Sequence, residues 1–377
     1  MTTTINNEHK KLNVPNLRFK EFQGEWKKCT LEDVMNFSTT RVNSSELNEG
    51  NYISTENMLQ DYQGIVDAKS VPEDVNVISF SCGDILISNI RPYLKKVWKA
   101  TYNGGCSSDV FVLKANDNIE SDYLHYVIAN DKFINFVMSG AKGVKMPRGD
   151  KNQMKTYSLS LPQIQEQKKI GKMLSLLDER IATQNKIIED LKKLKSAISE
   201  NRFKEVKGDV VMLSEICEIS KGKQINGEFL SERGKYYVMN GGTEPSGYYN
   251  NYNVEANTIS ISEGGNSCGY VQFNTSPFWS GGHCYTIQEI ADNVDNLYLF
   301  HFLKSKEDAI MKLRIGSGLP NIQKKDLAMF KIKIPTVEQQ KAISTFLSSL
   351  ERKAEIEERI QNAMQEEKQY LLRQMFI

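Results

Sequence analysis

The chain has 377 residues, of which 40% are hydrophobic and 25% charged, and its formal net charge is +1. This length allows two domains with cores of their own, and the balanced charge argues against a protein that coats nucleic acid indiscriminately. No apolar run approaches the roughly 18 residues of a membrane span, and the first residues lack the apolar segment of a signal peptide. We therefore expect a cytoplasmic protein.

The first 160 residues predict a globule that mixes strands and helix. The segment before Pro15 is polar and is expected to be a mobile tail. Beyond Leu31, short apolar segments alternate with Gly, Asn and Ser clusters, as in strands joined by loops. The expected strands are 83–88, 110–113 and 158–161, and a helix is expected at 122–138. This pattern predicts an α+β globule.

A long amphipathic segment follows at 161–203. Its apolar residues recur in steps of four and three, which is the spacing of a coiled-coil seam. The seam residues are Ile170, Leu174, Leu177, Ile181, Ile188 and Leu191, with Gln184 as the polar member. A helix of about 40 residues would be roughly 60 Å long, and one apolar stripe does not stabilise it alone, so a packing partner is required.

The same plan occurs a second time in the chain. Adding 173 to the residue numbers carries Pro162 onto Pro335, and the second seam consists of Ile343, Leu347, Leu350, Ala354 and Met364, with Glu357 in the place of Gln184. The expected domains are a first globule at 1–160, a first helix at 161–207, a second globule at 208–333 and a second helix at 334–377. We expect the two helices to pair antiparallel with pseudo-two-fold symmetry. The alternative is that each stripe packs on its own globule.

Motifs of the common nucleotide-binding and zinc-protease sites do not occur in the sequence. There is no GxxxxGK[ST], GxGxxG or HExxH, and the six cysteines are scattered singly, as expected of free thiols. The glycine-rich segment 263–270 lacks the following helix of a phosphate loop and is more typical of turns between strands. No cofactor or metal is therefore expected on this chain.

Basic clusters interleaved with polar and aromatic residues occur in both globules. Lys and Arg neutralise phosphates, and Asn, Gln and Arg bond base edges. Candidate DNA-binding residues of the first globule are Asn89, Arg91, Tyr93, Lys95, Lys96, Lys142, Lys145, Arg148 and Lys151. Those of the second globule are Lys221, Lys223, Gln224, Asn266, Lys312, Arg314, Asn321 and Lys324. The alternative is an ordinary solvated surface, which is less economical because the clusters recur in both halves.

Several motifs together resemble the specificity subunit of type I restriction-modification systems. They are PNLRFKEFQGEW at 15–26, LPQIQEQKKIGKMLSLLDERI at 161–181, IPTVEQQKAISTFLSSLE at 334–351 and LPN at 319–321. The resemblance implies two target recognition domains that read a split double-stranded DNA target, separated by a spacer of two helices. One departure is MPR at 146–148, which stands where the second half has LPN.

The resemblance also implies partners. A subunit of this family has no active site and docks two adenine-N6 methyltransferase subunits, which use S-adenosylmethionine, and restriction subunits that use ATP and Mg. Two other classes stay open. A stand-alone DNA-binding regulator would need no methyltransferase, and a coiled-coil protein adaptor would show no salt-dependent DNA binding.

Overall fold

The computed structural model describes residues 13–143, 145–316, 318 and 320–377. The chain forms two compact units: unit 1 comprises Met1–Thr183 and Gln361–Ile377, and unit 2 comprises Gln184–Ile360. The boundary between them falls inside the two long helices rather than at the ends of the globules. The polar tail up to residue 12, and Val144, Ser317 and Leu319 of the two basic loops, lie outside the described residues.

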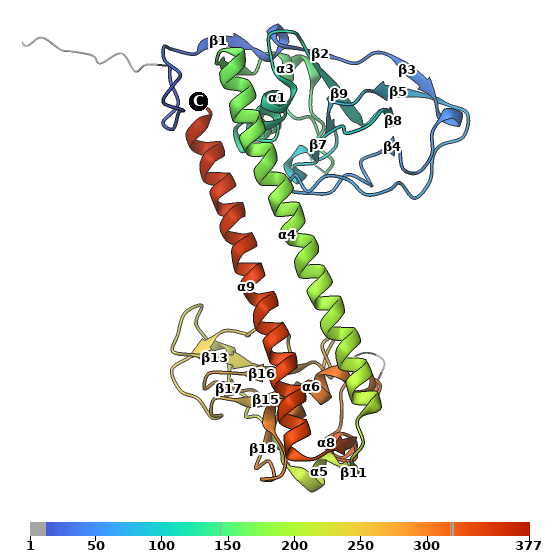
Figure 1. Ribbon diagram of the computed structural model, residues 1–377, viewed down its shortest axis with the longest axis vertical. Helices are drawn as coiled ribbons and strands as arrows, with labels where there is room; N and C mark the ends of the chain where they lie inside the picture. The colour runs from blue at the N-terminus through green and yellow to red at the C-terminus, as the bar shows by residue number, and fades with distance from the viewer. Residues whose placement is uncertain (1–12, 144, 317, 319) are drawn as a thin grey trace, which may run out of the picture. The chain divides into compact units, whose positions relative to one another are not determined.

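Unit 1 is built on two four-stranded sheets (Figure 1). Its strands are β1 (Lys27–Thr30), β2 (Met35–Phe37), β3 (Arg41–Asn43), β4 (Tyr52–Ile53), β5 (Asn76–Phe80), β6 (Ile85–Ser88), β7 (Val97–Lys99), β8 (Gly104–Cys106), β9 (Val110–Ala115) and β10 (Ser158–Leu161). One sheet has the order β2-β9-β6-β7 and is antiparallel throughout; the other has the order β3-β5-β8-β4, with β4 and β8 parallel. β1 pairs separately with β10.

Unit 2 repeats the antiparallel sheet and the separate strand pair. Its strands are β11 (Asp209–Met212), β12 (Glu218–Lys221), β13 (Tyr236–Met239), β14 (Tyr248–Tyr249), β15 (Thr258–Ser262), β16 (Val271–Asn274), β17 (Trp279–Ser280), β18 (Cys284–Gln288) and β19 (Lys331–Ile334). The order β12-β18-β15-β16 matches β2-β9-β6-β7, and β11-β19 matches β1-β10. The second sheet differs, because here it has three strands in the order β14-β13-β17. The two halves therefore share a framework and diverge in the remainder.

Each unit also contains short helices. They are α1 (Ser121–Ile128), α2 (Asp131–Ser139) and α3 (Lys151–Lys155) in unit 1, and α5 (Leu213–Ile216), α6 (Asn296–Ser305), α7 (Glu307–Met311) and α8 (Lys324–Ala328) in unit 2. The prediction of a single helix at 122–138 is wrong in one respect. The segment forms two helices, because Asn130 caps a new helix after Ile128 by accepting a hydrogen bond from the Lys132 amide at 3.0 Å.

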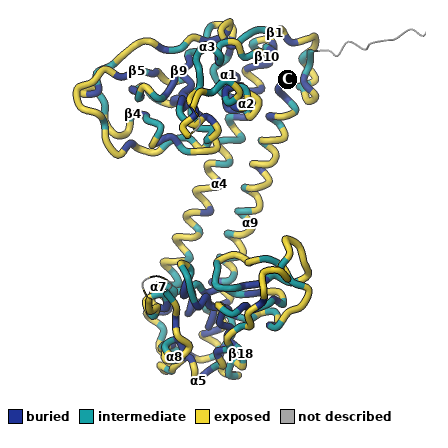
Figure 2. The backbone as a smooth tube through the Cα atoms, turned by 180° about the vertical axis from the view of Figure 1, so that it is seen from behind, coloured by how far each residue is buried: buried dark blue, intermediate teal, exposed yellow. Residues whose placement is uncertain are grey.

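The two predicted long helices are α4 (Ile164–Glu205) and α9 (Val337–Met375). Each begins two residues after a proline, Pro162 or Pro335, where proline excludes the preceding residue from helical geometry. Seam residues near the start of each helix are fully buried, namely Ile170 and Leu174 in α4 and Leu347 in α9. Farther along, much of the helix surface is exposed, as Figure 2 shows for both helices. The mixed fold with two globules, each followed by a long helix, is confirmed.

A buried glutamine fixes the start of each long helix to its globule. In unit 1, Gln167 donates to the carbonyls of Pro162 and Asn118 at 2.9 and 3.2 Å and accepts from the Glu120 amide at 2.8 Å. In unit 2, Gln340 makes the same three bonds, to Pro335, Asn293 and Asp295. Because a buried amide is costly unless its hydrogen bonds are made, these bonds define how the helix leaves the globule.

An aromatic residue at or just beyond the end of each long helix packs into a core. Phe203, near the end of α4, is 2% exposed and packs against Tyr298 and Phe302 of α6, with ring centroids 5.6 and 5.3 Å apart. Phe376, just beyond α9, stacks on Tyr123 of α1 at 5.2 Å. Since 203 and 376 are equivalent positions of the repeat, the same anchor closes the core of each unit.

The two helices also contact each other within each unit. In unit 2, Gln184 donates to the Glu357 carboxylate at 2.5 Å and Lys195 pairs with Glu351 at 2.7 Å, so the two segments run antiparallel there. In unit 1, Lys368 pairs with Asp178 at 2.5 Å. The last two pairs occupy equivalent positions of the repeat. The polar residues that interrupt the two seams thus contact each other.

Candidate nucleic-acid interface

Each unit has a polar cluster where the central strand of its repeated sheet ends. We call these clusters tip 1 (Asn89, Arg91, Asp109, Lys142 and Arg148) and tip 2 (Lys221, Glu263, His283, Tyr285 and Asn321). Asn89 follows β6 directly, and Glu263 follows β15.

The backbone around these two residues is the same in both units. The backbone amide of Asn89 donates to the Asp109 carbonyl at 2.7 Å, and the Asn89 carbonyl accepts from the Gly149 amide at 3.0 Å. The backbone amide of Glu263 donates to the His283 carbonyl at 2.9 Å, and the Glu263 carbonyl accepts from the Ile322 amide at 2.8 Å. Asn89 and Glu263 are therefore structurally equivalent residues.

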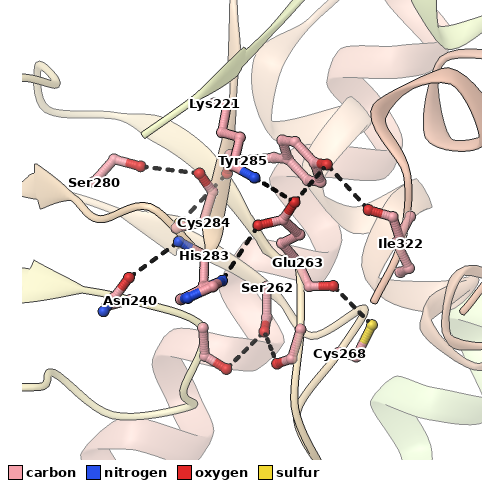
Figure 3. Close-up of polar contacts among 12 residues, drawn as sticks. Lys221, Asn240, Ser262, Glu263, Cys268, Ser280, His283, Cys284, Tyr285 and Ile322 are labelled. Carbon is pink, nitrogen blue, oxygen red and sulfur yellow. Dashed lines mark hydrogen bonds and ion pairs between the residues drawn. The ribbon is translucent and has the colours of Figure 1, made fainter. Parts of the chain in front are cut away.

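Tip 2 is organised around the Glu263 carboxylate (Figure 3). Its Oε1 lies 2.6 Å from Nζ of Lys221, the last residue of β12, and accepts from the Tyr285 hydroxyl at 3.1 Å. The other oxygen, Oε2, lies 3.5 Å from Nδ1 of His283. Tyr285 also contacts the Ile322 carbonyl at 3.0 Å. One acidic group thus holds side chains from two strands and one loop.

Tip 2 combines a buried carboxylate with exposed basic side chains. The Glu263 side chain is 9% exposed, whereas those of Lys221 and His283 are 51% and 63% exposed. Burial, followed by the charge of Glu263, raises the pKa of the Tyr285 hydroxyl, so it remains a neutral donor. The negative charge lies inside, and basic groups that can contact a ligand lie outside.

Close backbone packing holds the loops that carry tip 2. A Cβ on Gly222, next to Lys221, would lie 2.1 Å from the Gly281 carbonyl oxygen, so only glycine fits there. The amide of His283 donates to Oδ1 of Asn240 at 3.0 Å. The loops after β12, β13 and β17 are thereby joined around Glu263.

Tip 1 has a comparable arrangement made by different residues. Nη1 of Arg148 lies 2.8 Å from Oδ1 of Asp109, with the side chains 51% and 34% exposed. Arg148 and Lys142 exchange two backbone hydrogen bonds of 2.9 and 3.1 Å, and the Arg91 amide donates to Pro147 at 2.7 Å. Asn89 lies beneath them, 9% exposed, and its buried Oδ1 has no hydrogen-bond partner among the described residues.

Other basic candidates of unit 1 are already engaged by the protein. Lys95 pairs with Asp131 at 2.8 Å, and Lys151 lies over the Phe111 ring at 4.7 Å. Lys96 donates to the Thr55 carbonyl at 2.5 Å, and burial, with the charge of Arg91, lowers its pKa. Tyr93 and Lys145 are exposed.

The remaining candidates of unit 2 lie on exposed loops and helix ends. Asn321 exchanges two backbone hydrogen bonds with Ile315, of 2.8 and 3.0 Å, as Arg148 does with Lys142. The other exposed candidates are Lys223, Gln224, Asn266, Lys312, Arg314 and Lys324. The structure brings Lys221 and Asn321 to the Glu263 loop. DNA contact by all of these residues stays a prediction.

Four tip residues were missed by sequence reasoning: Asp109, Glu263, His283 and Tyr285. Sequence reasoning followed basic clusters, whereas two of these side chains, Asp109 and Glu263, matter as carboxylate partners of a cation. The alignment of the two halves held a signal, because ILIS before Asn89 and ISIS before Glu263 place both residues after equivalent strands.

Two further properties of the described residues bear on chemistry. Between residues 13 and 377, apart from positions 144, 317 and 319, no helix has the length and apolar character needed to cross a bilayer. In the same part of the chain, no three His, Cys, Asp or Glu side chains form a group that could hold a metal.

Comparison with known proteins gives consistent matches. The model of the type I restriction modification DNA specificity domain matches residues 23–193 and 205–366. A candidate type I specificity subunit of Mycoplasma pneumoniae is 33% identical over 145 residues, 38% of this chain and 38% of that protein. The specificity subunit of a type I restriction enzyme from Methanocaldococcus jannaschii is 26% identical over 312 residues, 71% of this chain and 72% of that protein.

A solved structure resembles the whole fold. The crystal structure of the S subunit of a type I restriction-modification system from M. genitalium has a TM-score of 0.72 at 18% identity and covers 97% of this chain and 99% of that one. At this identity the likeness concerns the fold.

Proposed function

Because the chain belongs to the type I restriction-modification DNA specificity family, we propose that it reads a split DNA target, one half with tip 1 and the other with tip 2. Its role is DNA sequence specificity, exerted by two target recognition domains. The observation that carries the proposal is that, in both units, a half-exposed basic group pairs with a carboxylate at the same end of the repeated sheet. Two similar readers suit a bipartite target.

The long helices would serve as the spacer of this device. Support comes from the equivalent ion pairs Lys195–Glu351 and Lys368–Asp178, and from the Gln184–Glu357 hydrogen bond where equivalent positions of the two seams meet. An antiparallel coiled coil of the predicted seam would set the separation of the half-sites, which we expect to lie about one DNA turn apart, roughly 34 Å.

Chemistry would come from partner subunits in the cytoplasm. Two adenine-N6 methyltransferase subunits with S-adenosylmethionine would modify the target, and restriction subunits with ATP and Mg would cleave unmodified DNA. This chain would determine the DNA sequence at which the reaction takes place, and it would supply the surface on which the methyltransferases assemble.

The test is a map of N6-methyladenine in DNA from cells that carry this gene and a methyltransferase partner, against cells lacking this gene alone. Loss of methylation at one split motif, both halves together, is expected. An unchanged map in cells shown to make both proteins would contradict the proposal and favour a regulator or adaptor.

A further inference from the structure

We propose that each recognition domain reads a guanine of its half-site through one cation held by a carboxylate: Arg148, held by Asp109, in the first domain and Lys221, held by Glu263, in the second. This inference rests on the proposed function and names the base class that two residues select.

The carboxylates restrict the two cations. An exposed Lys or Arg samples many rotamers, and fixing it at a ligand costs conformational entropy. Here Nη1 of Arg148 lies 2.8 Å from Asp109, and Nζ of Lys221 lies 2.6 Å from Glu263. Each head group is therefore oriented before DNA arrives, and preorganisation of this kind favours specific contacts.

Donors remain after the protein contact is made. A guanidinium has five N–H donors and an ammonium three, and the ion pair with the carboxylate uses one of them. Both side chains are 51% exposed. Each cation can therefore contact its carboxylate and a base at the same time.

The donor-only character of these groups selects guanine. In the major groove guanine presents two acceptors, N7 and O6, whereas adenine and cytosine each present an amino donor, which faces a cation unfavourably, and thymine presents one acceptor, O4, beside a methyl group. Arg or Lys on guanine N7 and O6 is the commonest specific contact in protein–DNA complexes.

The arrangement is not a simple remnant of the duplication. Backbone hydrogen bonds make Asp109 equivalent to His283, and Gly149 equivalent to Ile322, so Arg148 corresponds to Asn321. The two cations come from different places in the fold, β12 in one case and the loop before α3 in the other. The shared feature is the cation with its carboxylate at the end of the sheet, as expected if its position toward DNA matters.

A phosphate contact is the competing role for both residues. Loss of a phosphate contact weakens binding at all sequences alike, whereas loss of a base contact relaxes one position. Glu263 acts in this proposal as a positioning residue, so its replacement should alter base preference even though the carboxylate does not touch DNA.

The experiment is methylation mapping with variants, each co-expressed with the methyltransferase and shown to co-purify with it. The variants are Arg148→Gln, Lys221→Gln and Glu263→Gln, with Lys207→Gln as the control, because Lys207 is an exposed lysine in the joint between α4 and β11. The wild-type motif should contain a guanine in each half. Lys221→Gln and Glu263→Gln should reduce the preference for guanine about tenfold to a hundredfold at one position of one half-site, and Arg148→Gln should do so in the other half.

Each outcome decides the matter. A wild-type motif with no guanine in one half overturns the inference for that domain while the proposed function stands. A uniform fall of methylation, with base preference unchanged, makes the residue a phosphate contact and overturns it too. If Glu263→Gln does not co-purify, Lys221→Gln alone decides for the second domain. A wild-type map that does not depend on this gene refutes the proposed function itself.

Discussion

Replacing Phe203 by alanine tests whether the end of α4 is part of the core of unit 2. The ring is 2% exposed and packs edge-on against Tyr298 and Phe302. A buried Phe→Ala change costs about 3–5 kcal/mol through lost transfer free energy and the cavity it leaves, and each aromatic pair contributes about 0.5–1.5 kcal/mol of the loss. We expect the free energy of unfolding of unit 2 to fall by that amount.

Native-state hydrogen exchange measures this change separately for each unit. Amides of β15 and β18 should lose protection equivalent to about 3–5 kcal/mol, while those of β6 and β9 in unit 1 keep theirs. Phe229→Ala is the control, because that ring is 64% exposed and its loss should cost within about 0.5 kcal/mol. A loss below about 1 kcal/mol for Phe203→Ala, or an equal loss in both units, would refute the view that this ring anchors the helix in unit 2.

Three further predictions concern buried groups. Gln340→Leu removes three hydrogen bonds of a fully buried amide and should destabilise unit 2 by about 1–3 kcal/mol in urea titration. Gln339→Leu, at an exposed neighbouring position, should cost little. Equal effects of the two changes would contradict the role of Gln340 in fixing α9 to its globule. Burial lowers the pKa of His125 from 6.5 to about 3, so the unfolded chain binds the proton first and the free energy of unfolding of unit 1 should fall as pH falls through this window. His125→Phe should flatten this dependence of the unfolding free energy on pH. An unchanged dependence would assign it to other groups. Cys82 is exposed, whereas burial raises the pKa of Cys106 to about 12; a thiol reagent at pH 8 should therefore label Cys82 in the folded protein and Cys106 after denaturation, and rapid native labelling of Cys106 would contradict its burial.

The long helices and some strands of the repeated sheet could be predicted from sequence because their signals are local. The steps of four and three at Ile170 and Leu174 define one face of a helix, and Pro162 defines its start to within two residues. The four-residue strand β6 is buried throughout, and its continuous apolar run made it recognisable. Strands of two residues, such as β4 and β14, carry no periodicity, so the sheets they belong to were not predicted.

The tips could be predicted only in part. Their cations were identified because Lys and Arg cluster along the sequence, but the acids that hold them are distant in the chain. Arg148 and Asp109 are 39 residues apart, and Lys221 and Glu263 are 42 apart. These pairs exist only after β9 and β6, or β12, β18 and β15, have formed the sheet. Such long-range pairing decides which cation is oriented by a carboxylate and which, like Lys151, lies over an aromatic ring of its own domain.

The closing of unit 1 by the end of α9 sets an order for folding during synthesis. Leu372, Met375 and Phe376 belong to the same core as Tyr123 and Leu124, and about 250 residues must be translated between these two groups. At about 5–20 residues per second this takes on the order of ten seconds or more. Unit 2 is continuous in sequence from Gln184 to Ile360, so it can close first. The recognition domain that leaves the ribosome earlier is completed later, and its apolar α1 surface needs protection from aggregation in the meantime.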